Sequence, residues 1–258
     1  MSTRATSTVV TSGAEQAAAA SAQLLLMALL ATVCGLGPLG MLAGVAYAAV
    51  LLGLLTGALR HARKPRLGPA DLVTLARALL AGGVTALVVD SLLTGKTAWV
   101  AIVVVASVAL VLDGVDGQVA RRTGTASPMG ARFDMEVDAF LILVLSAHVA
   151  AIVGVWALAI GAMRYAFVAG GWAWPWLRGS LAPTVSGKAV AALQGVVLVV
   201  AGAGLLPDVA AVALVATALA ALCVSFGRDV LRLHRAAAVD LAGPARSVTG
   251  SAVVCPAH

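Results

Sequence analysis

Negative charge is concentrated in one short stretch of this chain. The 258 residues include only 11 Asp and Glu, and five of these lie between Asp113 and Asp138, flanked by long apolar runs. An ionised Asp at the centre of a bilayer costs roughly 2.5–3.5 kcal/mol on insertion scales, and carboxylates that lie together also repel one another. The cluster therefore indicates a site that receives positive charge.

The first half of this stretch places its polar residues on one helical face. If residues 99–121 form a helix, five of them share a face at offsets 0, 3, 4, 7 and 8: Asp113, Asp116, Gly117, Ala120 and Arg121. The two small residues would let a large group approach the backbone. The guanidinium of Arg121 can bind a phosphate through two N–H groups.

The second half predicts another helix with the same chemistry. Ser127 can cap it and Pro128 suits its first position, and Gly130, Asp134 and Asp138 follow at offsets 0, 4 and 8. Because the connection is short, the two helices are expected to be antiparallel neighbours. Their faces can then bring four carboxylates together.

Divalent metal is the expected counter-charge for such a cluster. Lys is absent from the stretch, Arg121 offers one charge on the shared face, and Arg122 and Arg132 lie off it. Carboxylate oxygens suit Mg²⁺ or Mn²⁺, and two such ions can bridge a diphosphate. The plain alternative is an acidic, solvated loop, which does not explain why the acids share a face.

The helices that carry these residues are expected to span a membrane. Apolar types make up 61% of the chain, charged types only 11%, and the mean hydropathy is +1.03, a composition that soluble globular domains do not have. The net charge of +6 could suggest a nucleic-acid partner. It lies in short loops between apolar runs, however, and this is typical of a protein oriented in a lipid bilayer.

Apolar runs predict an all-α integral membrane protein with about eight spans. Residues 1–19 are expected to be a disordered cytoplasmic N-terminus, 20–60 a transmembrane hairpin interrupted at "GLGPLG", 61–235 a six-span catalytic domain, and 236–258 a flexible cytoplasmic tail. The six spans are predicted near 70–93, 97–119, 131–152, 154–173, 188–206 and 208–228.

The distribution of basic loops predicts the orientation. With the loop "RHARKPRLGP" (60–69) in the cytoplasm, nearly every loop Lys and Arg lies on the same side, as the positive-inside rule expects. The acidic stretch then faces the cytoplasm from the cell membrane. The small residues of the hairpin would allow a packing role or a homodimer.

The acidic stretch resembles the signature of the CDP-alcohol phosphotransferase family, D-x-x-D-G-x-x-A-R, eight residues, then G-x-x-x-D-x-x-x-D. All eight fixed positions are present here: Asp113, Asp116, Gly117, Ala120, Arg121, Gly130, Asp134 and Asp138. The resemblance covers about residues 70–232. It implies a six-helix core with the signature on its second and third helices, so the N-terminal hairpin is an addition to that core.

The resemblance also implies an activity and roles for these residues. The family moves a phosphoalcohol from a CDP-linked donor, here expected to be CDP-diacylglycerol, to an alcohol and releases CMP. Asp113, Asp116, Asp134 and Asp138 would hold two Mg²⁺ or Mn²⁺ ions, and Asp138 would also be the general base for the acceptor hydroxyl. Contacts with the CDP moiety are implied for a partly overlapping set: Asp113, Gly117, Ala120, Arg121 and Gly130.

Three basic residues outside the signature are candidate acceptor contacts. Arg164 lies inside an apolar run, where Arg is a functional candidate, although a pair with a carboxylate or with carbonyl groups would also explain it. Lys188 and Arg77 lie near cytoplasmic ends of predicted helices, so acceptor binding and a positive-inside anchor are both open. Lys188 belongs to "GKAVAALQ", which resembles part of a phosphatidylglycerophosphate synthase pattern and favours glycerol 3-phosphate as the acceptor.

Two other classes also use acids in membranes. A membrane prenyltransferase binds diphosphate through Mg²⁺ at Asp-rich motifs, but its first motif lacks the G-x-x-A-R continuation found here. A cation transporter would place its acids near mid-membrane on interrupted helices. In this sequence the acids lie toward predicted cytoplasmic helix ends, with an Arg on the same face.

Overall fold

The computed structural model describes residues 3–62, 69–123, 128–179 and 185–242, in part without side chains. Over these ranges all regular structure is helical. There are eight α-helices and two short 3₁₀ turns: α1 (Thr3–Cys34), α2 (Pro38–Ala62), α3 (Pro69–Thr94), α4 (Trp99–Thr123), α5 (Pro128–Val153), η1 (Val155–Ala157), α6 (Leu158–Ala173), η2 (Pro175–Arg178), α7 (Val185–Gly202) and α8 (Asp208–Ala242).

Six segments of the described chain are long and apolar enough to cross a membrane, which confirms an all-α, multi-pass membrane protein. These spans are Gln16–Cys34, Pro38–Gly57, Asp71–Thr94, Gly130–Val153, Val155–Ala173 and Asp208–Ala237. α4 and α7 carry shorter apolar stretches, Trp99–Val115 and Ala189–Gly202. The eight predicted spans therefore correspond to the eight α-helices, six of which have full spanning length over the described residues.

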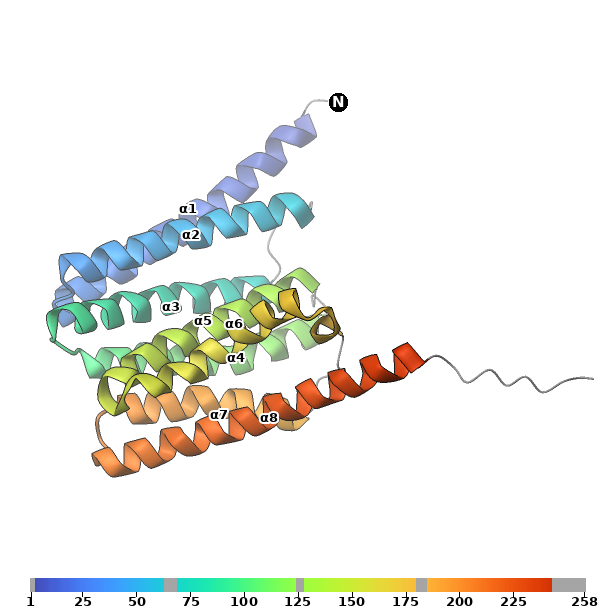
Figure 1. Cartoon of the computed structure of the whole chain (residues 1–258). Coiled ribbons are helices and arrows are strands. Elements are labelled where there is room, and N and C mark those ends of the chain that lie inside the picture. Colours follow the sequence, from blue (N-terminus) through green and yellow to red (C-terminus); the bar gives the residue numbers. More distant parts are fainter. Residues whose placement is uncertain (1–2, 63–68, 124–127, 180–184, 243–258) are drawn as a thin grey trace, which may run out of the picture.

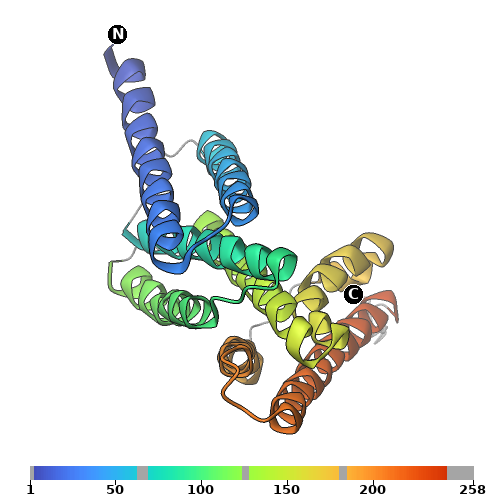
Figure 2. The same cartoon turned by 90° about the vertical axis from the view of Figure 1, so that its left-hand side faces the viewer.

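The helices run side by side and alternate in direction (Figure 1). The hairpin of α1 and α2 lies along one side of α3, and α7 and α8 lie at the opposite side of the bundle (Figures 1 and 2). The C-terminal end of α4 and the N-terminal ends of α3 and α5 meet at the same end of the bundle. This alternation places the acidic signature at one end of the bundle.

α3 is the most enclosed of the spanning helices. Within the bundle 61% of its span is buried, against 22% of the spans in α1 and α2. Its buried residues Ala81, Val84 and Leu87 belong to a core shared with α4, α5, α7 and α8. The site-forming helices α4 and α5 are therefore held against the most buried helix of the bundle.

Two helix ends differ from the sequence expectations. α1 begins at Thr3, so most of the segment 1–19, expected to be disordered, is helical. Its run of Ala, Glu and Gln has high helix propensity and leads directly into an apolar span. α8 continues to Ala242, into the expected tail 236–258, whereas residues 243–258 lie outside the described chain.

The turn between α1 and α2 follows from local backbone chemistry. Gly35 after α1 has a φ of +68°, a left-handed conformation that glycine adopts without steric cost. Pro38 then begins α2, where its missing N–H costs nothing. These signals confirm the predicted interruption at "GLGPLG".

Candidate metal and nucleotide site

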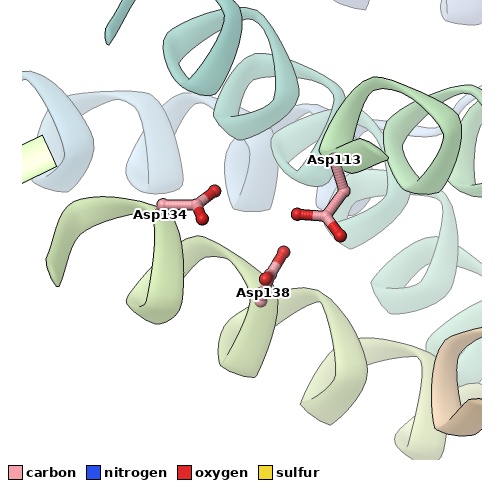
Figure 3. A group of neighbouring side chains, drawn as sticks. All are labelled: Asp113, Asp134 and Asp138. Carbon is pink, nitrogen blue, oxygen red and sulfur yellow. The ribbon is translucent and has the colours of Figure 1, made fainter. Parts of the chain in front are cut away.

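Three aspartates from two helices converge at one end of the bundle. Asp113 comes from α4, and Asp134 and Asp138 come from α5. Each offers a carboxylate oxygen, and these atoms all lie within 4.8 Å of one another (Figure 3). All three side chains are partly exposed. The structure thus brings together three of the four carboxylates that the sequence predicts to share a site.

Local sequence explains why these side chains meet. Asp134 and Asp138 are four residues apart on α5, so they project from the same helical face. α4 ends at Thr123 and α5 begins at Pro128, so the short connection makes the two helices antiparallel. Over the described residues they are not the packed neighbours that the sequence predicts, because α3 packs against each of them and brings Asp113 close to the first turns of α5.

Several predicted residues can be placed only on their helix. Asp116, Gly117, Ala120 and Arg121 all lie in α4, one to two turns beyond Asp113 toward its C-terminal end. Their side chains lie outside the described residues, so their metal and CDP contacts stay predictions. Gly130 lies in the first turn of α5, on the turn before Asp134.

A buried arginine on α3 occupies the centre of the carboxylate cluster. The side chain of Arg77 is only 1% exposed, and its Nη2 lies 2.9 Å from Oδ1 of Asp113. It also forms ion pairs with Asp134 and Asp138. Its Nε donates to the backbone carbonyl of Ala109, at 3.3 Å. The guanidinium therefore bridges α3 to both helices of the signature.

The position of Arg77 corrects a sequence expectation. An exposed positive-inside anchor was one of its two expected roles, and burial among acids rules that role out. Acceptor binding by Arg77 stays a prediction, and it would require the guanidinium to exchange part of its ion pairs for the acceptor. The missed signal was the charge balance, because a cluster short of positive charge should draw a basic residue from a neighbouring span.

Arg164 is not part of this cluster. It lies on α6 and forms an ion pair with Glu136 of α5, which is the carboxylate pair left open by the sequence. Glu136 is two residues from both Asp134 and Asp138, so it projects from the opposite side of α5. Lys188 lies in the first turn of α7, and its side chain is outside the described residues.

The donor set fits a divalent cation. Three carboxylates within reach of one another offer only oxygen atoms, the ligands that Mg²⁺ and Mn²⁺ prefer. Asp113, Asp134 and Asp138 are the residues that would hold such an ion. A bound divalent ion would neutralise charge on a diphosphate and polarise its phosphorus.

Comparison with known proteins agrees with this chemistry. The sequence model of the CDP-alcohol phosphatidyltransferase family matches residues 68–226, more than half of the chain. The matched region runs from the start of α3 into α8 and leaves the hairpin of α1 and α2 outside. No curated protein and no solved structure matches the chain.

Proposed function

The chain belongs to the CDP-alcohol phosphatidyltransferase family, and we propose that it transfers a phosphatidyl group from CDP-diacylglycerol to a small alcohol. The family transfers such a group from a CDP-alcohol to an alcohol. The observation that carries the proposal is the convergence of Asp113, Asp134 and Asp138. A charged site at one end of a membrane bundle suits a donor with a polar nucleotide and an apolar lipid.

Asp138 is the proposed general base. Its carboxylate lies in the cluster and is partly exposed, so an acceptor hydroxyl can reach it. Asp138 would take the hydroxyl proton while the acceptor oxygen forms a bond to the phosphatidyl phosphorus. The bond from that phosphorus to the CMP oxygen breaks, and CMP leaves with the electron pair. Proton transfer of this kind contributes about 10²–10⁴-fold to a rate.

The signature residues of α4 would bind the nucleotide. Asp113, Asp116 and Asp134 are proposed metal ligands together with Asp138. Gly117 and Ala120 would let the CDP moiety approach the α4 backbone, and Arg121 would bind its phosphate. Gly130 would leave room for the same moiety at the start of α5. The family match over residues 68–226 includes all of these positions.

A phosphorylated acceptor, with glycerol 3-phosphate favoured, is proposed from Arg164 and Lys188. Nε of Arg164 is buried and has no hydrogen-bond partner among the described residues, so this side chain has an unused donor. To bind an acceptor phosphate, Arg164 would exchange its ion pair with Glu136 for the phosphate oxygens. The cytoplasmic leaflet of the cell membrane is the proposed location, because the positive-inside rule assigns the basic loops of the sequence, and the signature among them, to the cytoplasm.

CMP release by the purified full chain in mixed micelles tests the proposed function. CDP-diacylglycerol is offered with glycerol 3-phosphate, inositol phosphate, inositol or serine in turn, each with Mg²⁺, with Mn²⁺ and with chelator. Release that requires metal and one acceptor is expected. If folded protein releases no CMP with any acceptor, the proposed donor is wrong. Binding of CDP by the same sample then shows whether the site takes a nucleotide.

The ligand assignment has its own measurement. Asp113→Asn removes one carboxylate charge from the cluster and should shift the Mn²⁺ dependence of CMP release to higher concentration. The matched control is Asp229→Asn on α8. It also removes an acid, one whose Oδ1 lies 3.7 Å from Nη1 of Arg232. An identical Mn²⁺ titration for wild type and Asp113→Asn would contradict the assignment.

A further inference from the structure

Arg77 contacts every carboxylate of the described cluster. Nη2 lies beside Asp113 and Asp138, and Nη1 lies beside Asp134. These are the same three residues whose oxygens lie close enough together to hold one metal ion. A single guanidinium therefore pairs with the same three carboxylates that a divalent cation would use.

This guanidinium cannot simply move into water. Its side chain is 1% exposed, and Nε is tied to the Ala109 carbonyl on α4. Ala78, the next residue on α3, is fully buried and belongs to an apolar cluster with Leu51, Leu55 and Val137. Arg77 thus remains close to the cluster whatever else binds there, and its positive charge always acts on that cluster.

Two cations at one set of carboxylates oppose each other. Without metal, three neighbouring carboxylates repel one another, and the guanidinium offsets part of that repulsion. With metal bound, the guanidinium and the ion repel each other and draw on the same three carboxylates. Coulomb interactions at a few ångströms are strong in partly buried sites, because water screens them poorly.

We propose that Arg77 is the resident counter-ion of the carboxylate cluster. It holds Asp113, Asp134 and Asp138 together when no divalent ion is bound, and it competes with that ion for their oxygens. Arg77 is then a positioning residue that stabilises the metal-free protein and lowers metal affinity. The inference rests on the proposed function only in taking these aspartates as metal ligands.

The competition must be reciprocal. If the metal weakens the Arg77 contacts, those contacts weaken metal binding by the same factor, and such couplings are typically about 5–150-fold. A residue that merely supported the fold would leave the metal affinity unchanged or would lower it when removed. The sign of the change therefore separates a counter-ion from a structural arginine.

Mn²⁺ binding to the purified full chain provides the test. Free Mn²⁺ is followed by its electron paramagnetic resonance signal in wild type, in Arg77→Gln and in the control Arg232→Gln. Arg232 lies on an exposed part of α8 beside Asp229, far along the chain from the signature. We expect Arg77→Gln to bind Mn²⁺ about tenfold more tightly and Arg232→Gln to match wild type. Equal or weaker binding by Arg77→Gln overturns the proposal.

Unfolding in detergent supplies a second readout. In chelator, Arg77→Gln should unfold at a lower denaturant midpoint than wild type, and Mn²⁺ should restore most of the loss. If Arg77→Gln does not fold even with Mn²⁺, Arg77→Lys decides. Lys keeps the charge but cannot contact three carboxylates at once, so it should bind Mn²⁺ more tightly than wild type. Unchanged or weaker affinity in Arg77→Lys overturns the proposal.

The outcomes for the two proposals are separable. In one outcome, wild type binds Mn²⁺ but releases no CMP, and Arg77→Gln binds Mn²⁺ more tightly. The proposed donor is then wrong, and the counter-ion role of Arg77 is supported. In the other outcome, wild type releases CMP in a metal-dependent way, and Arg77→Gln has unchanged Mn²⁺ affinity. The proposed function is then supported, and the counter-ion role of Arg77 is wrong.

Discussion

The two sides of α3 are stabilised in opposite ways. Toward α4 and α5, the buried guanidinium of Arg77 is engaged by three carboxylates and a backbone carbonyl. Toward the hairpin, α3 presents Gly82 and Gly83, and α1 and α2 approach closely. There the amide of Gln23 is buried without a hydrogen-bond partner among the described residues. On one side of α3 a charged group is held by ion pairs, and on the other side the helices associate through close packing.

The hairpin side follows the physics of helix packing in lipid. Lipid chains are as apolar as the helices, so association depends on close packing and small residues rather than on the hydrophobic effect. A Cβ on Gly82 would lie 2.6 Å from the Tyr47 ring, so only glycine allows this approach. Substitutions on the hairpin side should change stability alone, whereas substitutions on the acidic side should also change chemistry.

Tyr47 of the hairpin contacts both α3 and the site-forming helix α5. Its hydroxyl donates to the carbonyl of Ala78, at 2.9 Å, next to Arg77 on α3. Its ring lies 5.1 Å from the ring of Phe140, two residues beyond Asp138 on α5. The family match begins after the hairpin, so this support of the site is an addition to the shared core.

The largest predicted effect is on the acidic side. Asp138→Asn removes the proposed base, so CMP release should fall by about a hundredfold or more, with little change in the free energy of unfolding. Turnover and detergent unfolding are measured on the same samples, with Asp229→Asn as the control. Turnover near the wild-type level would show that Asp138 is not the base.

Gly82→Leu tests the shape of the hairpin side. The new side chain would meet a Tyr47 ring that is held by its hydroxyl and by Phe140, so the hairpin must shift. Overpacking of this kind costs about 1–3 kcal/mol, measured as the free energy of SDS-induced unfolding. Gly53→Leu is the matched control, since a Cβ at Gly53 has nothing within 4 Å. Equal stability of the two variants would mean that the contact is not tight.

Gln23→Leu is expected to stabilise the protein, by about 1 kcal/mol, because it removes buried polar atoms that lack partners. Gln194→Leu is the contrasting case, since Nε2 of Gln194 donates to the Ala218 carbonyl at 3.0 Å and only its Oε1 is buried without a partner among the described residues. That variant should lose stability, by about 1 kcal/mol. Detergent unfolding of both variants measures the contrast. A loss of stability in Gln23→Leu would show that this amide has a partner in the membrane.

The smallest predicted effect concerns the hydroxyl of Tyr47. Tyr47→Phe removes the hydrogen bond to α3 and keeps the ring against Phe140, so a loss of about 0.6 kcal/mol is expected. Tyr165→Phe is the control, because no hydrogen bond of its hydroxyl is found over the described residues. A reduced turnover in Tyr47→Phe beyond this small stability loss would show that the hairpin also positions the site.

Sequence reasoning reached the parts of the site that lie within one helix or across one short turn. Asp134 and Asp138 share a face because of the helical period, and the short α4–α5 connection makes the two helices antiparallel, but Asp113 meets them because α4 and α5 both pack on α3. Arg77 could not be assigned in this way. It precedes Asp113 by 36 residues, and the rotation of α3 that turns it inward depends on how that helix packs. Arg164 was similarly ambiguous until its neighbour Glu136 was placed.

The sequence by itself determined the all-helical membrane fold, the family and the acids of the site, because helical period, hydropathy and short turns are local properties. Tertiary structure alone decided which side of each helix faces which neighbour. That choice places Arg77 among the acids and leaves Arg164 outside them. It also packs the hairpin of α1 and α2 against Gly82 and Gly83 of α3. These outcomes depend on contacts between residues far apart in the chain, and no local pattern encodes the rotation of one helix against another.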